Sequence, residues 1–109
     1  IRAFLDARVH MLSSGVRRGC LMINTCVELA PHDVKVAEQL QSGLATMRLG
    51  FEIALNRALE QGEIPQDANV SELAVFLNAQ VAGMTVMAKN QASQQELQAV
   101  ADQALRSLR

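Results

Sequence analysis

Aromatic residues are nearly absent from this chain of 109 residues, which has three phenylalanines and no tryptophan or tyrosine. Strand signals are missing as well, because no segment alternates apolar and polar residues over a useful length and neither Asn-Gly nor Asp-Gly occurs. Half of the residues are nonetheless hydrophobic, so the core has to be built from Leu, Ile, Val, Met and Ala. This composition favours helix packing, and the length suits one domain. We therefore predict a single all-α domain.

Residues that could perform chemistry are also scarce. The chain has two cysteines and two histidines, and the six-residue spacing of Cys20 and Cys26 does not suit a chelating pair on a helix. No nucleophile–base motif and no glycine-rich phosphate loop is present. We therefore expect no metal, no cofactor and no catalytic activity.

Charge of one sign does not accumulate anywhere. The net charge is −1, and the adjacent Arg17 and Arg18 are too few to form the basic patch that nucleic acid requires. The longest weakly polar stretch, 73–88, is interrupted by Asn78, Gln80 and Thr85, so we expect no membrane span. Two cysteines without a disulfide-dense pattern favour the cytoplasm. By itself this chain should bind neither nucleic acid nor membrane.

Helical spacing, in contrast, is present throughout the chain. We predict about five helices, at 1–13, 20–30, 33–61, 70–90 and 94–106. Pro31 ends the second, because a residue before proline avoids the helical conformation. The third carries a seam of apolar residues at alternating steps of three and four: Ala37, Leu40, Leu44, Met47, Phe51, Ala54 and Ala58.

Several residues mark the helix ends. Gly62 is placed as the residue just past the third helix. Asn69 with Glu72, and Ser93 with Glu96, have the spacing of capping boxes at the starts of the fourth and fifth helices. Gly43 and Gly50, inside the third helix, weaken it; they serve either close packing against a neighbouring helix, which we favour, or room for a ligand.

The fourth predicted helix is apolar on nearly every side. Such a helix is buried on more than one side, and a domain of this size cannot easily surround it alone. We expect the fourth and fifth helices to pair with their copies as a four-helix bundle in a homodimer. The predicted interface residues are Val75, Ala79, Ala82, Gly83, Val86, Leu97, Ala101, Ala104 and Leu108.

The order and spacing of several segments resemble a known family. The segment 18–31 (RGCLMINTCVELAP) is followed by a long helix ending at 58–65 (ALEQGEIP), and then by 73–77 (LAVFL), Gly83 and Ala88-Lys89. Together these resemble the C-terminal ligand-binding and dimerisation domain of TetR/AcrR-type transcriptional regulators, over essentially the whole chain. The resemblance implies a helix-turn-helix head preceding residue 1, which binds operator DNA as a dimer. It also implies a ligand that relieves repression by favouring a different conformation.

The resemblance to this family also implies a ligand pocket between the first four predicted helices. The candidate ligand-binding residues are Met11, Cys20, Asn24, Met47, Phe51, Phe76, Gln80 and Met84. Methionine adapts to varied apolar ligands, and Asn24 and Gln80 could orient a small apolar or electrophilic effector by hydrogen bonds. Alternatively, the methionines are ordinary core residues, and the two amides bond across the dimer or to backbone carbonyls.

Cys20 provides a second hypothesis. It lies at a predicted helix N-terminus, after Arg17 and Arg18, where a thiol pKa is lowered. The Gly-Cys-Leu sequence, with Gly83 and Ala88-Lys89, resembles electrophile-sensing members of the family. Cys20 would then be a redox-sensing thiol with Lys89 as a nearby cation. The alternatives are that Cys20 is a small buried hydrophobe, or that the chain is a helical dimeric interaction module without a ligand.

Overall fold

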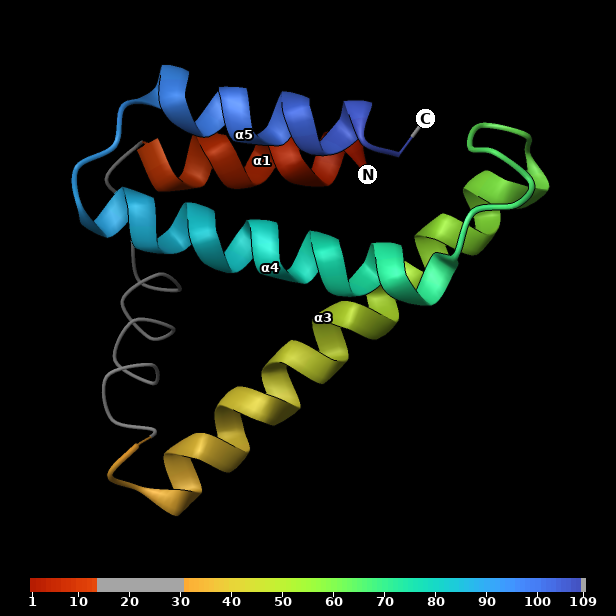
Figure 1. Cartoon of the computed structure of the whole chain (residues 1–109). Coiled ribbons are helices and arrows are strands. Elements are labelled where there is room, and N and C mark those ends of the chain that lie inside the picture. The colour runs from red at the N-terminus through yellow and green to blue at the C-terminus, as the bar shows by residue number, and fades with distance from the viewer. Residues whose placement is uncertain (14–30, 109) are drawn as a thin grey trace.

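The computed structural model describes residues 1–13 and 31–108 of the chain, and within these ranges it consists of helices with no strand (Figure 1). The helices are α1 (Arg2–Ser13), α3 (Val34–Glu60), α4 (Val70–Lys89) and α5 (Gln94–Arg106). The all-α prediction is confirmed. The bounds of α5 are as predicted, α1 and α4 differ from their predicted bounds by one residue at one end, and α3 differs by one residue at each end. The helix predicted at 20–30 lies outside the described residues.

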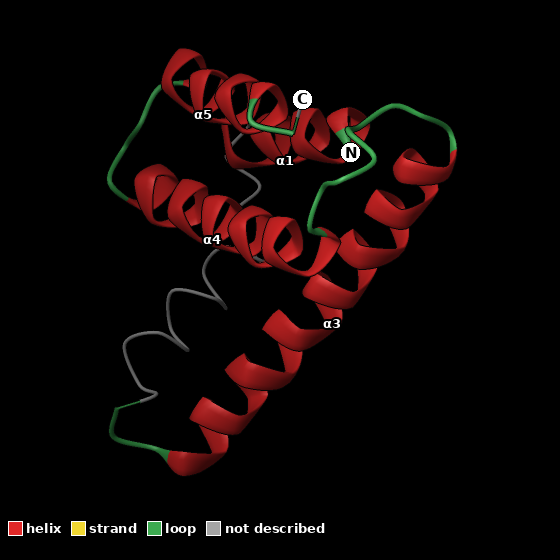
Figure 2. Ribbon diagram, turned by 45° about the vertical axis from the view of Figure 1, so that its right-hand side comes forward, coloured by secondary structure: helices red, strands yellow, loops and turns green. Residues whose placement is uncertain are grey.

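Three of the helices lie side by side. In Figures 1 and 2, α4 and α5 run antiparallel, α1 packs alongside α5 and runs antiparallel to it, and α3 crosses α4 obliquely and extends away from the other helices. The fold is flattened, with principal extents of 42 × 32 × 16 Å and a radius of gyration of 14.5 Å, against roughly 13 Å for a compact domain of this length. The shortest extent, 16 Å, is thus only somewhat larger than a helix diameter of about 10–12 Å.

The core is built around α4, which packs on α3, α5 and α1. Its inner residues recur at helical spacing and are buried: Ala74, Leu77, Val81, Met84 and Ala88. They meet buried residues of the other helices, namely Leu5, Val9, Phe51, Leu55, Leu97, Ala101 and Ala104. The polar Thr85 is fully buried on the same helix, and its hydroxyl donates to the Val81 carbonyl at 3.0 Å, so burial leaves its donor satisfied.

By length and composition alone, α4 is apolar enough to cross a membrane, which differs from the expectation drawn from residues 73–88. In the structure its inner side fills the core. The apolar composition of α4 is therefore explained, on that side, by packing against three other helices.

Helix α3 ends in a glycine motif. The Gly62 N–H donates to the Leu59 carbonyl at 3.2 Å and the Glu63 N–H to the Ala58 carbonyl at 2.8 Å, while Gly62 has φ +72°. These two bonds define a Schellman motif, in which glycine adopts the left-handed conformation without a Cβ clash. The predicted role of Gly62 is confirmed.

Helix α4 ends in the same motif without a glycine. The Gln91 N–H donates to Ala88 O at 3.1 Å and the Ala92 N–H to Met87 O at 3.0 Å. Gln91 takes the left-handed position, with φ 67°, where a side chain costs about 1–2 kcal/mol. The equivalent motif is therefore relaxed at the end of α3 and strained at the end of α4.

The helix starts are capped by side chains. Ser93 and Glu96 form the predicted capping box at α5, with reciprocal bonds of 3.1 Å, and these bonds lower the pKa of Glu96. At α4, Asn69 accepts from the Glu72 N–H at 3.1 Å, but within the described structure Glu72 makes no return bond. The sequence did not predict that Asp33 caps α3, where it accepts from the N–H groups of Lys35 and Val36.

A polar cluster joins α1 to α5. The Arg2 guanidinium lies 3.4 Å from the Asp102 carboxylate and 3.8 Å from that of Asp6. The Gln98 amide donates to both carboxylates at 3.0 Å. The hydrogen bond from Gln98, followed by the contact with Arg2, lowers the pKa of Asp102. This cluster adds polar contacts between α1 and α5 to the packing of Leu5 and Val9 in the core.

The two Schellman motifs yield a paired prediction. Gln91→Gly should raise the free energy of unfolding by about 1 kcal/mol, and Gly62→Ala should lower it by about 1 kcal/mol, because only glycine adopts positive φ without strain. Urea denaturation followed by circular dichroism measures both. Changes of equal sign in the two variants would contradict the assigned strain.

The polar cluster yields a pH prediction. The pKa of Asp102 is lower in the folded chain than its ordinary value of 3.8, so its stabilising contribution is present at neutral pH and is lost as pH falls from about 5 through the folded pKa. Asp102→Asn should reduce stability at pH 7 and flatten its loss in acid. The exposed Asp67→Asn serves as the control, and an acid profile of Asp102→Asn identical to that of the parent would refute the assignment.

Candidate functional site

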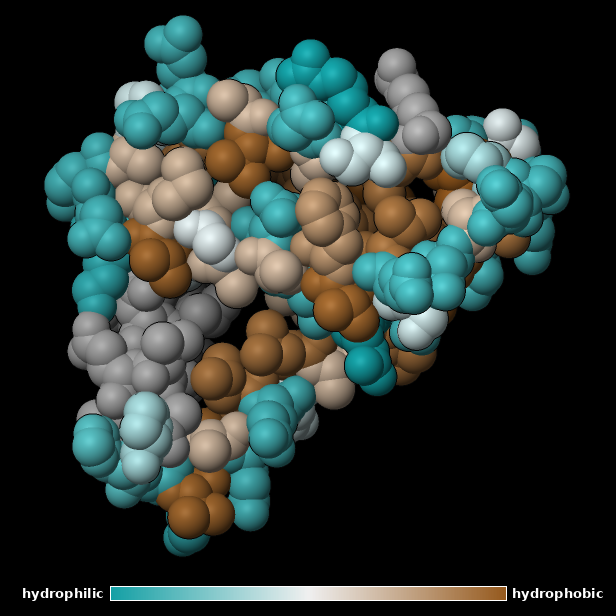
Figure 3. All heavy atoms as spheres, in the orientation of Figure 1, coloured by the Kyte–Doolittle hydropathy of each residue, from teal (hydrophilic) through white to brown (hydrophobic). Residues whose placement is uncertain are grey.

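A cavity of about 650 Å³ lies where α1, α3 and α4 face one another. We call it the central cavity, and its described lining residues are Phe4, Arg8, Gln39, Leu40, Gly43, Leu44, Thr46, Met47, Val81 and Ala82. Figure 3 shows hydrophobic atoms along the side of α3 that faces α4, next to a gap between these helices. The volume falls within the range of about 300–1,000 Å³ that is typical of small-molecule sites.

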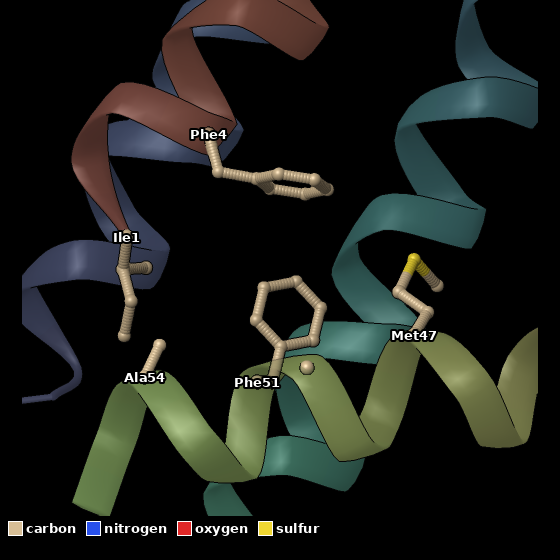
Figure 4. Close-up of a pocket in the computed structure, with 6 residues that line it drawn as sticks. Ile1, Phe4, Met47, Phe51 and Ala54 are labelled. Carbon is tan, nitrogen blue, oxygen red and sulfur yellow. The ribbon is translucent and has the colours of Figure 1, made fainter. Parts of the chain in front are cut away.

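A smaller cavity of about 250 Å³ adjoins it, and the two share Phe4 and Met47. The other lining residues of this aromatic cavity are Ile1, Gly50, Phe51 and Ala54. Figure 4 shows the Phe4 ring of α1 directed toward the Phe51 ring of α3. The ring centroids are 5.4 Å apart at an interplanar angle of 84°, an edge-to-face arrangement that is favourable for aromatic pairs. This pair forms the boundary between α1 and α3.

Two glycines leave space in the walls of these cavities. Gly43 lines the central cavity and Gly50 the aromatic cavity. They are seven residues apart and so lie on the same side of α3. A Cβ atom added at either position would meet no described atom within 4 Å. Among the described residues no helix packs closely on either glycine, and the choice between close packing against a neighbouring helix and room for a ligand stays a prediction.

Arg8 is the only charged side chain among the described lining residues of the two cavities. Its guanidinium carbon lies over the Phe4 ring, 5.3 Å from the centroid, which is a cation–π distance. Arg8 is half-buried, one helical turn after Phe4. The site therefore combines an apolar interior with a single oriented cation.

The structure brings together only some of the predicted ligand-binding residues. Met47 and Phe51 line the cavities. Met84 is fully buried in the core, and Met11 is half-buried against that core. Phe76 lines a separate cavity near Pro65 and Leu108, while Gln80 is half-buried and is not among the described lining residues of either cavity. Cys20 and Asn24 lie outside the described residues, so the sensor hypothesis stays a prediction; Lys89 is exposed.

Sequence reasoning missed most of the cavity wall. Leu40 and Leu44 belong to the predicted apolar seam of α3 but were not assigned to the site, and Phe4 and Arg8 were not singled out as a pair. Their four-residue spacing, which places an aromatic ring and a guanidinium on one side of α1, is the signal that could have identified them.

The predicted interface residues divide into two groups. Those of α4 face outward: Val75 and Val86 are 52% and 44% exposed, Ala79 and Gly83 are exposed, and Ala82 is half-buried. Those of α5, and the residue that follows its C-cap, are buried in the core of the chain: Leu97, Ala101, Ala104 and Leu108. The prediction that these residues also contribute to a dimer interface stays a prediction.

No cluster of three or more His, Cys, Asp or Glu residues suited to a metal ion occurs within residues 1–13 and 31–108. The cavity walls described above contain no carboxylate, histidine or cysteine. The described lining therefore offers hydrophobic contact and one guanidinium as its main means of binding.

Comparison with known proteins gives a consistent assignment. Residues 1–104 match the family model described as the tetracyclin repressor-like C-terminal domain. The HTH-type transcriptional repressor ComR of Escherichia coli K12 is 36% identical over 88 residues, which cover 81% of this chain and 42% of that protein. The uncharacterized HTH-type transcriptional regulator YezE of Bacillus subtilis 168 is 33% identical over 100 residues, which cover 90% of this chain and 52% of that protein.

The chain spans about half the length of these two relatives, and no solved structure matches it significantly. The family model covers nearly all of the chain, as the resemblance drawn from the sequence does. The chain therefore belongs to the TetR family of transcriptional regulators and is a C-terminal domain of the tetracyclin repressor-like type.

Proposed function

We propose that this chain is the effector-sensing and dimerisation domain of a TetR-type repressor. A small apolar effector occupies the central cavity, and its binding weakens the hold of an N-terminal helix-turn-helix head on operator DNA. The similarity to a transcriptional repressor of Escherichia coli supports repression as the output. Operator DNA is contacted only through that head, and the domain acts in the cytoplasm, where the operator is found.

The observation that carries the proposal is the central cavity itself. A helical interaction module without a ligand would have a filled interior, whereas the described helices α1, α3 and α4 line a cavity of about 650 Å³. The residues Leu40, Leu44 and Val81 supply hydrophobic contact, and Met47 can adapt its shape to a ligand. The absence of side chains at Gly43 and Gly50 keeps the space open.

The position of α1 suggests how binding is transmitted. Phe4 and Arg8 reach the cavity from one side of α1, while Arg2 and Asp6 bind α5 from another. A ligand that prefers one placement of α1 shifts the domain toward that conformation by its differential affinity, typically 1–3 kcal/mol. In the proposal the head precedes α1, so a displacement of α1 alters the spacing of two heads on the operator.

The outer side of α4 is the proposed dimer surface. Val75, Ala79, Ala82 and Val86 recur at steps of four, three and four, so they form one stripe along the helix. The stripe borders a groove of about 390 Å³ between α4 and α3. Small residues in this stripe allow two helices to approach closely, and none of the described helices α1, α3 and α5 covers this side, where Val75 and Val86 are exposed.

The cavity is tested by filling it. Gly43→Leu should fold, since leucine is a better helix former than glycine by roughly 0.8 kcal/mol and its Cβ meets open space. It should reduce binding of the neutral fluorescent dye N-phenyl-1-naphthylamine at least about tenfold, because its side chain occupies the ligand volume.

Ala99→Leu adds a leucine at an exposed position of α5 and should leave dye binding unchanged. Circular dichroism establishes that both variants remain helical. Undiminished dye binding by Gly43→Leu would count against the proposed pocket.

The dimer surface is tested by placing a charge on it. Val86→Glu should convert the dimer to a monomer in sedimentation velocity, because a buried, unpaired carboxylate at a helix interface is strongly unfavourable. Ile53→Glu is the matched control, since Ile53 is 57% exposed but lies on α3. If both variants keep the parent's mass, α4 is not the interface.

A further inference from the structure

We propose that the ligand of the central cavity is an amphipathic organic anion, whose apolar body fills the cavity and whose oxyanion, such as a carboxylate, is bound by Arg8. The inference rests on the proposed function, because it assigns a chemical class to the effector of the same site. The inference names one cation, Arg8, and one anionic group on the ligand. Ligands that differ only in their polar group can therefore test it.

The first observation is the orientation of the Arg8 side chain. Its guanidinium carbon lies over the Phe4 ring, 5.3 Å from the centroid. The ring thus contacts the guanidinium, while the five N–H donors of an arginine lie in the guanidinium plane. Among the described residues no carboxylate lies within ion-pair distance of Arg8, although Arg2 has two and Arg48 has one. The Phe4 ring therefore helps to hold the cation at the cavity wall with donors available to a ligand.

The second observation is the charge distribution around the cavities. No Asp or Glu belongs to the described lining of either cavity. The carboxylate of Asp6, two residues before Arg8, is bonded by Gln98 and lies 3.8 Å from the guanidinium of Arg2. That of Glu52 pairs with Arg48 at 3.7 Å. The described lining thus carries a net positive charge, and an anionic ligand would supply the missing counter-charge in a half-buried setting, where it is screened less than in water.

The third observation concerns the body of the ligand. Beyond Arg8, the central cavity is lined mainly by aliphatic side chains, including Leu40, Leu44 and Val81. The Thr46 hydroxyl donates to the Ser42 carbonyl at 3.0 Å, so its donor is already used. An extended alkyl chain therefore matches the interior, while Arg8 and the Phe4 ring set the polar end on the α1 side.

The test compares ligands that share one alkyl chain. Decanoate, decan-1-ol and decylamine compete with N-phenyl-1-naphthylamine for the purified chain at neutral pH and fixed ionic strength. Decanoate should compete roughly ten times better than decan-1-ol, and decylamine worst, because a charge-assisted hydrogen bond to arginine adds to a common hydrophobic contribution. Equal competition by decanoate and decan-1-ol would overturn the inference.

Variants of Arg8 test whether the preference for decanoate over decan-1-ol depends on this residue. Arg8→Met keeps an unbranched apolar side chain without the guanidinium, and it should weaken decanoate binding roughly tenfold to hundredfold while leaving decan-1-ol binding within about twofold. Arg8→Lys should keep part of the preference for decanoate. The control is Arg57→Met, which removes an exposed cation far along α3 and should leave that preference unchanged. An unchanged preference in Arg8→Met overturns the inference.

The same measurements separate this inference from the proposed function. If decan-1-ol binds and Gly43→Leu blocks it, but decanoate has no advantage, the pocket stands and the anionic class is wrong. If neither the dye nor any of the three compounds binds the parent chain, the pocket itself is wrong and the inference falls with it.

Discussion

The fold depends on the burial of α4. This helix contacts α1, α3 and α5, and its inner residues are almost entirely removed from solvent, with Leu77, Val81 and Met84 at 0% exposure. Each such side chain contributes roughly 1.5–3 kcal/mol when it is buried. Helix α3 is held to the other described helices chiefly through α4, whereas α1 and α5 also pack directly on each other. Loss of packing there would release α3 from the remaining helices, since no other described helix makes an extensive contact with it.

A flat arrangement of helices around one centre has two geometric consequences. The outer side of α4 is not covered by the described chain, which leaves Val75 and Val86 exposed. The oblique crossing of α3 also moves its N-terminal half away from α1, and the cavities lie in the resulting wedge. The proposed dimer surface and the proposed effector cavity therefore both result from the angles at which the other helices pack on α4.

The sequence predicted well those features that depend on local chemistry. Ser93 with Glu96 and Gly62 determine helix ends through bonds within a few residues, and they marked the start of α5 and the end of α3. It predicted less well which element each helix faces. Ala101 and Ala104 were predicted from their spacing to lie at a dimer interface, and the structure places them in the chain's own core, a distinction that periodicity does not make.

The candidate site was harder still to predict, because it depends on distances along helices as well as on their apolar sides. Phe76 and Met84 both belong to α4, yet eight residues of helix separate them by about 12 Å, so one lies at a distant cavity and the other in the core. Arg8 was missed because a charged residue on an amphipathic helix usually faces solvent. Only the placement of α1 against α3 shows that this one reaches a cavity.

The scarcity of aromatic residues has a spectroscopic consequence. Of the three aromatic rings in the chain, Phe4 and Phe51 contact each other at the cavity wall, and Phe76 lines a different cavity. The methyl groups of Ile1, Met47 and Ala54 lie around the Phe4–Phe51 pair (Figure 4). Ring-current shifts of these methyl resonances in nuclear magnetic resonance spectra would therefore arise mainly from this pair. The domain carries a native reporter of the distance between α1 and α3, read without any introduced label.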